Sequence, residues 1–280
     1  MSYKTILVHV DDSINLTPRI ELACRIALQE SAHLIGVATT GVSRYIYQSA
    51  VVDMSSDYIT GYIESLRQRA AASLTSFEAI TRRFGVLSVE QRLVDDENAG
   101  GISLQARYSD LVVLGQSDPA EPSAVVGNDF PEAVVLHSGC PALIVPYAGH
   151  FKNIGVKVLI AWDGSSQAKR AVHGAIPLLQ RAALVEVGIF NASERPDRHG
   201  AQPGADLALY LARHGIAINV QERIVPHEEI GAALLSHVAD TGTDMLVMGC
   251  FGHSRLREIL LDGVSRTILS SMTVPVFMSH

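Results

Sequence analysis

The chain is built from two successive copies of one sequence pattern. The segment 5–13 (TILVHVDDS) aligns with 157–165 (KVLIAWDGS) at an offset of 152 residues. The segments 109–115 (SDLVVLG) and 141–145 (PALIV) align with 243–249 (TDMLVMG) and 275–279 (PVFMS) at an offset of 134 residues. A repeat of this length predicts two tandem domains. We expect them to span 1–147 and 154–280, joined by a short turn-rich linker.

The two offsets differ by 18 residues, so the first copy carries extra material, which we place within 41–66. This stretch is unusually rich in tyrosine and aliphatic residues: Tyr45, Ile46, Tyr47, Val51, Val52, Met54, Tyr58, Ile59, Tyr62 and Ile63. Two interpretations remain open. The stretch is either part of an extended second helix that packs on its own domain or a surface that contacts a second chain.

Strand-like and helix-like patterns alternate along the second copy. Short apolar runs predict strands at 156–162, 184–190, 218–225, 245–248 and 274–278, and helical periodicity predicts helices at 166–181, 204–214, 228–241 and 264–272. Alternating βα units of this length predict an α/β fold, a doubly wound parallel five-stranded sheet of the Rossmann-like kind in each domain. In such sheets ligands bind beyond the carboxyl ends of the strands.

Composition narrows the classes of function. The formal net charge of −7 and the absence of a basic stripe argue against a nucleic-acid partner. No apolar run reaches the roughly 18 residues of a membrane span, and the N-terminus lacks the pattern of a signal peptide. Three widely spaced cysteines, Cys24, Cys140 and Cys250, suggest neither a disulfide framework nor a metal site, and the eleven histidines show no paired spacing. We therefore expect a cytoplasmic protein without a metal centre.

Three sequence features together resemble the universal stress protein family. Asp163 ends the first strand of the second copy, Val225-Pro226-His227-Glu228-Glu229-Ile230 follows the third, and Gly249-x-x-Gly252 followed by nine residues comes after the fourth. The double copy resembles the tandem members of that family. The resemblance implies an adenine-nucleotide alpha-hydrolase-like fold, and in the nucleotide-binding branch it implies ATP lying across the strand ends.

The resemblance also implies which residues would line a nucleotide site in the second domain. Gly249 and Gly252 would approach the phosphates, Asp163 the adenine or ribose, and Ala161 and Phe190 the base, while Val225-Pro226 would wall the pocket. His253 or Arg255 would supply compensating positive charge. The implied set is Ala161, Asp163, Gly164, Phe190, Val225, Pro226, Gly249, Gly252, His253, Arg255, Asp262, Gly263, Val264 and Ser265.

The loop departs from the family pattern at its end. Asp262 stands where the second-copy loop should have glycine, and Gly263 stands at the Ser/Thr position. An aspartate directly before a helix is a good N-cap, and its carboxylate would occupy donors near Ser265 that a phosphate needs. Its charge would also repel a polyphosphate unless Mg²⁺ intervened. Gly263 and Ser265 would still serve if the loop shifted by one residue.

The first copy has drifted further from a phosphate-binding pattern. Its loop reads Gly115-Gln116-Ser117-Asp118-Pro119-Ala120-Glu121-Pro122, with two acids, two prolines without N–H donors and no basic residue. We therefore expect a degenerate, structural first domain. The acidic pair Asp11-Asp12 survives at the end of the first strand, and the simplest interpretation is that Asp12 or Ser13 caps the first helix.

Three functions from different classes follow. The first is a stress-response protein that binds ATP or another adenine nucleotide, with or without Mg²⁺, in its second domain. The second is an interaction or scaffold protein that has lost nucleotide binding. The third is a slow ATPase in which Ser254 or Ser265 accepts a phosphoryl group, although no catalytic motif or base is identifiable. The family resemblance also implies that strands 142–146 and 274–278 pair as an intrachain pseudo-dimer, and a homodimer is a further expected assembly.

Overall fold

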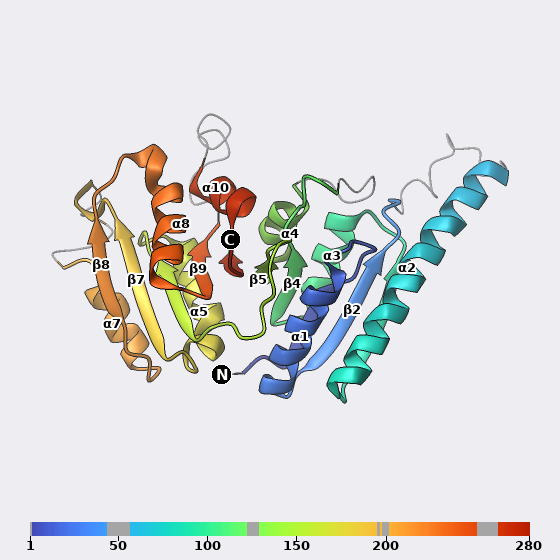
Figure 1. Cartoon of the computed structure of the whole chain (residues 1–280), viewed down its shortest axis with the longest axis horizontal. Helices are drawn as coiled ribbons and strands as arrows, with labels where there is room; N and C mark the ends of the chain where they lie inside the picture. Colours follow the sequence, from blue (N-terminus) through green and yellow to red (C-terminus); the bar gives the residue numbers. More distant parts are fainter. Residues whose placement is uncertain (1, 44–56, 122–128, 195–196, 198–201, 251–262) are drawn as a thin grey trace. The chain divides into compact units, whose positions relative to one another are not determined.

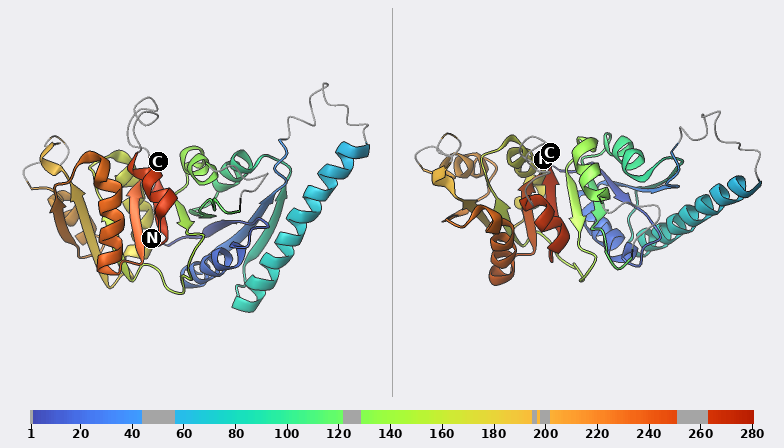
Figure 2. Two further views of the ribbon diagram at one scale, coloured as in Figure 1. Left: turned by 45° about the horizontal axis from the view of Figure 1, so that its top comes forward. Right: turned by 90° about the horizontal axis from the view of Figure 1, so that it is seen from above.

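The computed structural model describes residues 2–43, 57–121, 129–194, 197, 202–250 and 263–280. These residues form two compact units, 2–142 and 143–280 (Figures 1 and 2). The domain limits expected from the sequence, 1–147 and 154–280, stay a prediction.

The first unit is a parallel sheet with the strand order β3-β2-β1-β4. Its strands are β1 (Thr5–His9), β2 (His33–Thr39), β3 (Val89–Val94) and β4 (Leu111–Gly115). Its helices are α1 (Leu16–Glu30), α2 (Asp57–Phe84), α3 (Asn98–Ala106) and α4 (Phe130–Ser138). A further strand, β5 (Ala142–Val145), begins at the limit between the units. Helices α1 and α2 pack together, as do α3 and α4, so both faces of the sheet are covered.

The second unit repeats this architecture with the strand order β10-β9-β6-β7-β8, again with all neighbours parallel. Its strands are β6 (Lys157–Ala161), β7 (Leu184–Phe190), β8 (Asn219–Arg223), β9 (Met245–Gly249) and β10 (Val276–Ser279). Its helices are α5 (Ser166–Leu179), α7 (Ala205–Ala212), α8 (Ile230–Thr241) and α10 (Val264–Ser271), with short 3₁₀ turns η1 (Ala192–Glu194) and η2 (His227–Glu229). The predicted doubly wound α/β fold is therefore confirmed.

Helix α2 accounts for much of the extra length of the first copy. It has 28 residues, whereas α7, which follows the equivalent strand, has 8. One apolar stripe is buried along it: Ile63, Leu66, Ala70, Leu74, Phe77 and Ile80. The ring of Phe77 lies where a β-carbon on Gly36 of β2 would be, 2.7 Å from its ring carbons. The described part of the insertion thus packs on its own unit, and residues 44–56 lie outside the described part.

The helices and the cysteine side chains of the described residues bear on membrane insertion and on thiol reactivity. In the part of the chain that the structure describes, no helix is both long and apolar enough to cross a membrane. Cys24, Cys140 and Cys250 are each buried, and none of the three forms a disulfide bond. Burial raises the pKa of Cys24 and of Cys140 to about 12, so neither thiol forms a reactive thiolate near neutral pH.

Candidate functional site

The second unit has its topological switch point at β6. This strand pairs with β7 on one side and with β9 on the other. The connection from β6 runs to β7 on one side, and the chain returns from β8 to β9 on the other side, so the strand order reverses at β6. Ala161, the last residue of β6, lies in register with Gly188 of β7 and Met248 of β9. Phe190 lies over Gly188, with a ring carbon 3.4 Å from the place of an added β-carbon. Three predicted site residues, Ala161, Phe190 and Gly249, therefore meet at one edge of the sheet, where a parallel sheet binds ligands.

The turn after β6 is fixed by its own side chains. The Oδ1 atom of Asp163 accepts a hydrogen bond from the Ser165 amide at 3.0 Å, and Gly164 has a φ of 70° that a side chain would strain. Ser165 caps α5, because its hydroxyl oxygen accepts from the amide of Ala168 at 3.1 Å. Asp163 is exposed, so this turn presents a carboxylate to solvent beside the switch point.

Asn191 holds the segment that follows β8 against the end of β7. Its side-chain nitrogen donates to the carbonyl of Val225 at 2.8 Å, and its oxygen accepts from the Val225 amide at 3.0 Å. The residue is buried and adopts a left-handed backbone with φ of 54°, which asparagine tolerates better than most residues. Val225 is thereby fixed to Asn191, the residue that follows Phe190 in the chain. Asn191 is not among the site residues predicted from the sequence, since a single asparagine after a strand is typical of an ordinary turn.

Gly249 has a structural reason to be glycine. A β-carbon there would lie 2.5 Å from the backbone nitrogen of Ala168 and 2.8 Å from the carbonyl carbon of Gln167. The first turn of α5 thus occupies the space beside the end of β9. The glycine permits this close helix–strand approach whether or not a ligand is bound.

The helix that follows the glycine loop begins one residue later than a capping Asp262 requires. The N-cap of α10 is Gly263, which has an extended backbone and no side chain to cap the helix. The interpretation of Asp262 as the N-cap is therefore wrong. Val264 starts the helix, and Ser265 is buried in its first turn. Gly252, His253, Arg255 and Asp262 lie outside the described residues.

The first unit carries a buried ionic cluster at its own switch point. Asp11 accepts from the guanidinium of Arg19 at 2.5 Å and from the hydroxyl of Ser13 at 2.7 Å. The guanidinium lies where a β-carbon on Gly115 would be, so it fills the space beside the end of β4. The N-cap of α1 is Asn15, so the expectation that Asp12 or Ser13 caps this helix is wrong.

His9 completes this cluster from the last position of β1. Its Nδ1 atom lies 3.6 Å from Asp11 Oδ2, and its ring packs on Phe130 with centroids 4.5 Å apart. Burial lowers the pKa of His9 to about 4, with a smaller opposing effect from Asp11. Burial is the largest single effect on Asp11 and acts against its ionisation, but Arg19, His9 and Ser13 together outweigh burial and hold the pKa of Asp11 below its usual range. At neutral pH the cluster is thus a carboxylate–guanidinium pair beside a neutral imidazole.

Two arginines of α2 pair with acidic residues that follow strands of the first sheet. Arg67 forms a bidentate pair with Asp95 after β3, at 3.0 and 2.8 Å, and Arg69 pairs with Asp12 after β1. Neither pair was predicted from the sequence, because each arginine lies far along the chain from its partner. These contacts fasten α2 across the carboxyl edge of the first sheet.

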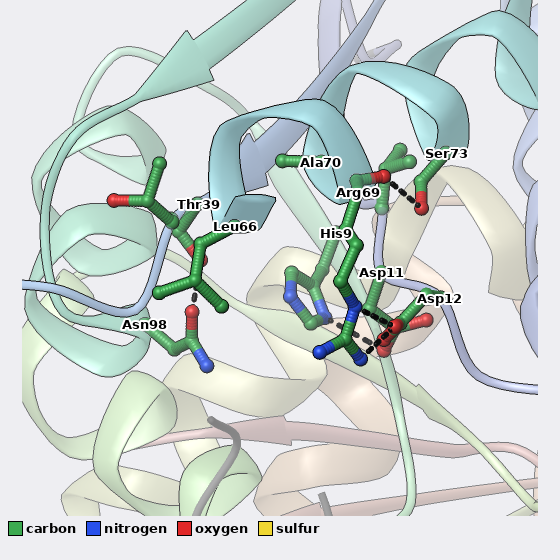
Figure 3. A pocket seen from close by; sticks show the side chains of 11 residues that line it. His9, Asp11, Asp12, Thr39, Leu66, Arg69, Ala70, Ser73 and Asn98 are labelled. Carbon is green, nitrogen blue, oxygen red and sulfur yellow. Dashed lines mark hydrogen bonds and ion pairs between the residues drawn. The ribbon is translucent and has the colours of Figure 1, made fainter. Parts of the chain in front are cut away.

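A cavity of about 40 Å³ lies beneath this part of α2 (Figure 3). Thr39 and Asn98, which share a hydrogen bond, lie on one side, and Asp11, Asp12 and Arg69 lie on the other. The remaining lining residues are His9, Val10, Thr40, Leu66, Ala70 and Ser73. Among the described residues of the whole chain, no three His, Cys, Asp or Glu side chains are grouped as a metal site would need.

Comparisons with known proteins agree on one family. The sequence model of the universal stress protein family matches residues 2–146 and 156–280. Universal stress protein Slr1230 of Synechocystis is 29% identical over 171 residues, which are 60% of this chain and 56% of the relative. The chain therefore spans just over half the length of that curated relative.

One solved structure shows the same fold over nearly the whole chain. The crystal structure of a universal stress protein from Archaeoglobus fulgidus covers 98% of this chain and 97% of its own, with a TM-score of 0.72 and 15% identity. Another solved protein, described as a universal stress protein in complex with cAMP, covers 53% of this chain and 100% of its own, with a TM-score of 0.38 and 20% identity.

Proposed function

Because this chain belongs to the universal stress protein family, with one copy of the domain in each half, we propose that it is a stress-response protein whose second unit binds an adenine nucleotide. The nucleotide would lie at the carboxyl edge of β6 and β9. The proposed partner is thus a small molecule, and the proposed place of action is the cytoplasm.

The observation that carries this proposal is the convergence of separate elements on the switch point of the second sheet. Ala161 ends β6, Phe190 ends β7, and Asn191 fixes Val225-Pro226 beside it. The side chains of Ala161, Phe190, Val225 and Pro226 are apolar, and apolar side chains suit the face of a base. Helix α10 runs back between the parallel strands β9 and β10, so its N-terminus lies toward the same edge as the end of β9.

The start of α10 suits an anionic group. Its N-cap, Gly263, leaves the first-turn amides without a capping side chain from that residue. Such amides, together with the positive end of the helix dipole, favour a phosphate. Asp262 opposes this by its charge, and we propose that Mg²⁺ offsets the repulsion when ATP is the ligand. His253 and Arg255 are the proposed sources of further positive charge, and Gly252 gives the phosphates room.

The first unit has a structural role in this proposal. The Arg19 guanidinium fills the space beside Gly115 at the end of β4. We further propose that strands 142–146 and 274–278 pair within the chain as a pseudo-dimer and that two chains associate as a homodimer.

The negative charge of Asp262 favours a second candidate, a scaffold protein without a bound nucleotide. Isothermal titration of ATP, with and without Mg²⁺, separates the two for the parent and for Asp262→Gly. We expect the variant to bind about tenfold more tightly when Mg²⁺ is absent, since a fixed like charge has been removed. Asp118→Gly, the matched change in the loop of the first copy, should leave the affinity unchanged.

Each other outcome has a definite meaning. If Asp262→Gly binds no better than the parent, the repulsion assigned to Asp262 is wrong. If neither protein binds ATP, the scaffold function replaces the nucleotide-binding one. Release of ADP over hours above a buffer control would instead support the slow ATPase.

A further inference from the structure

The outer strand of the second sheet has an open edge. Strand β8 is the last strand in the sheet order, and among the described residues it pairs only with β7 (Figure 1). Four of its five residues are exposed, and Ile224, which follows the strand, is 84% exposed. A free strand edge presents a row of backbone donors and acceptors that can pair with another strand.

The outer strand of the first sheet, β3, is better covered. Only two of its six residues are exposed, and the 28-residue helix α2 packs against it. Its charged side chains Glu90 and Arg92 pair with each other. Helix α7, the counterpart of α2, has 8 residues. The outer strand is therefore covered in the first unit and exposed in the second.

Strand β8, all of which the structure describes, lacks the usual features that block pairing at an edge. It contains no proline and no lysine, and its pairing with β7 runs from Asn219 to Arg223 without a bulge. Its two charged side chains, Glu222 and Arg223, have opposite signs. The edge is therefore able to accept a further strand.

We propose that β8 pairs antiparallel with β8 of a second copy of this chain, so that the two sheets join edge to edge. This assigns a surface to the proposed homodimer and rests on that proposal. It does not depend on nucleotide binding.

The outward backbone groups of β8 belong to alternate residues. The carbonyl oxygen of Arg223 accepts from the amide of Asn191 at 2.9 Å, so the backbone of Arg223 faces β7. Because the direction alternates along a strand, Gln221 also faces β7, whereas Val220 and Glu222 face outward. Two copies related by a two-fold axis pair residues whose numbers add to an even sum. Outward residues therefore meet outward residues, as the hydrogen bonds require.

The length and the charges of β8 select one register. With Gln221 on the two-fold axis, all five residues of β8 face a residue of the other β8, and Glu222 lies opposite Val220 of the second copy. An axis at Glu222 or at Arg223 would place like charges opposite each other, which is destabilising. An axis at Val220 would leave only the pairs formed by 219–221.

The same register matches the remaining side chains. Ile224 lies opposite Ile218 of the second copy, so an exposed apolar residue at each end of the contact gains an apolar partner. Arg223 lies opposite the polar Asn219, and the two Gln221 amides, each of which can donate and accept, face each other. The edge is thus complementary to itself.

Analytical ultracentrifugation of the full chain over a range of concentrations tests the proposal. Two five-residue strands make a small interface, so we expect a dimer that dissociates on dilution. Ile224→Lys should raise the dissociation constant at least about tenfold, since each dimer loses two apolar pairs. Leu93→Lys makes the same change at an exposed residue of β3 and should leave the constant within about twofold of the parent.

Cysteine cross-linking tests the register. Facing residues without mutual hydrogen bonds have Cα atoms about 4.5 Å apart, which is within reach of a disulfide. Gln221→Cys should therefore give a covalent dimer when oxidised by air with copper–phenanthroline. In Asn219→Cys the two thiols would lie about 13 Å apart along the strands, too far for a disulfide. The three native cysteines are buried, so the parent should not cross-link.

The possible failures are distinguishable. A parent that stays monomeric at every concentration would overturn the homodimer and this interface together. A dimer that Ile224→Lys leaves unchanged, or that Asn219→Cys cross-links as fully as Gln221→Cys, would keep the homodimer and overturn the interface. Equal weakening by Leu93→Lys and Ile224→Lys would show instead that β8 pairs with β3 of the next molecule, an arrangement that builds rings or filaments. None of these results bears on ATP binding in the second unit.

Discussion

The imidazole of His9 is held uncharged by its place at the end of a buried strand. Burial lowers its pKa to about 4, whereas an unfolded histidine titrates near 6.5. Between these values the unfolded chain binds more protons than the folded one, so the folded state loses stability as the pH falls. The pKa of Asp11 is also lowered in the folded state. The stability that its carboxylate contributes is lost mainly below the unfolded pKa of about 3.9.

The contribution of His9 to the free energy of unfolding should therefore be constant above about pH 6.5. As the pH drops to 4, this contribution should fall by up to about 3 kcal/mol. In His9→Gln that part of the fall should be absent, as measured by urea unfolding at each pH. Burial lowers the pKa of His237 in the same direction, so a residual slope remains in the variant. His150→Gln, at an exposed position, is the control. Equal slopes for the parent and His9→Gln would contradict the assignment.

Individual site residues were predictable only where the sequence keeps them near their strand. The acidic pair Asp11-Asp12 and the turn at Asp163 could be located because each directly follows a recognisable strand. Arg69 could not be, because it reaches Asp12 from 57 residues away, through the folding of α2 over the sheet. The N-cap of α10 was misplaced by one residue, since Asp262 and Gly263 are both acceptable caps by local preference alone.

The approach of α5 to β9 depends on the missing side chain at Gly249. Gly249→Ala should lower the free energy of unfolding of the second unit by about 1–3 kcal/mol, because the new methyl group would meet the backbone of Gln167 and Ala168. Gly61→Ala is the matched control in α2. It meets nothing within 4 Å and replaces a helical glycine, so it should be stabilising by about 0.5–1 kcal/mol.

Urea unfolding of both variants measures whether each substitution lowers or raises the free energy of unfolding. A neutral Gly249→Ala would mean that α5 adjusts without strain. The comparison also bears on ligand binding, because a loss of nucleotide affinity in Gly249→Ala can arise from displacement of α5 and does not by itself identify a phosphate contact.

Elements were more predictable than residues. Every strand and α-helix expected in the second copy is present, because the repeat and the strand–helix alternation constrain each other. The bounds differ at the ends, as at His227–Glu229, where the expected helix begins with a 3₁₀ turn before α8. Such ends are decided by local hydrogen bonds that hydrophobic periodicity does not report.

Each half of the molecule has its own sheet and its own buried core. Phe77 and Phe277 are both fully buried, one in each unit. Trp162 is the sole tryptophan of the sequence and belongs to the second unit. Its fluorescence therefore reports on that unit, while circular dichroism reports on both.

We expect Phe77→Ala to cost the first unit about 3–5 kcal/mol and to leave the Trp162 transition in urea unchanged. Phe277→Ala should shift the Trp162 transition to lower urea. If Phe77→Ala moves the fluorescence transition as far as Phe277→Ala does, the chain unfolds as one cooperative body and the expectation of independent units fails.

The amphipathic register of α2 limits how the first copy can change in length. Each residue turns an α-helix by about 100°, so removing seven residues would rotate the part before the cut by only about 20°, whereas removing five would rotate it by about 140°. The second change would carry Ile63 and Leu66 from the sheet into water. Insertions and deletions in this helix should therefore be tolerated in multiples of seven residues, which is about two turns. A variant shortened by seven residues would keep its apolar stripe packed on the sheet.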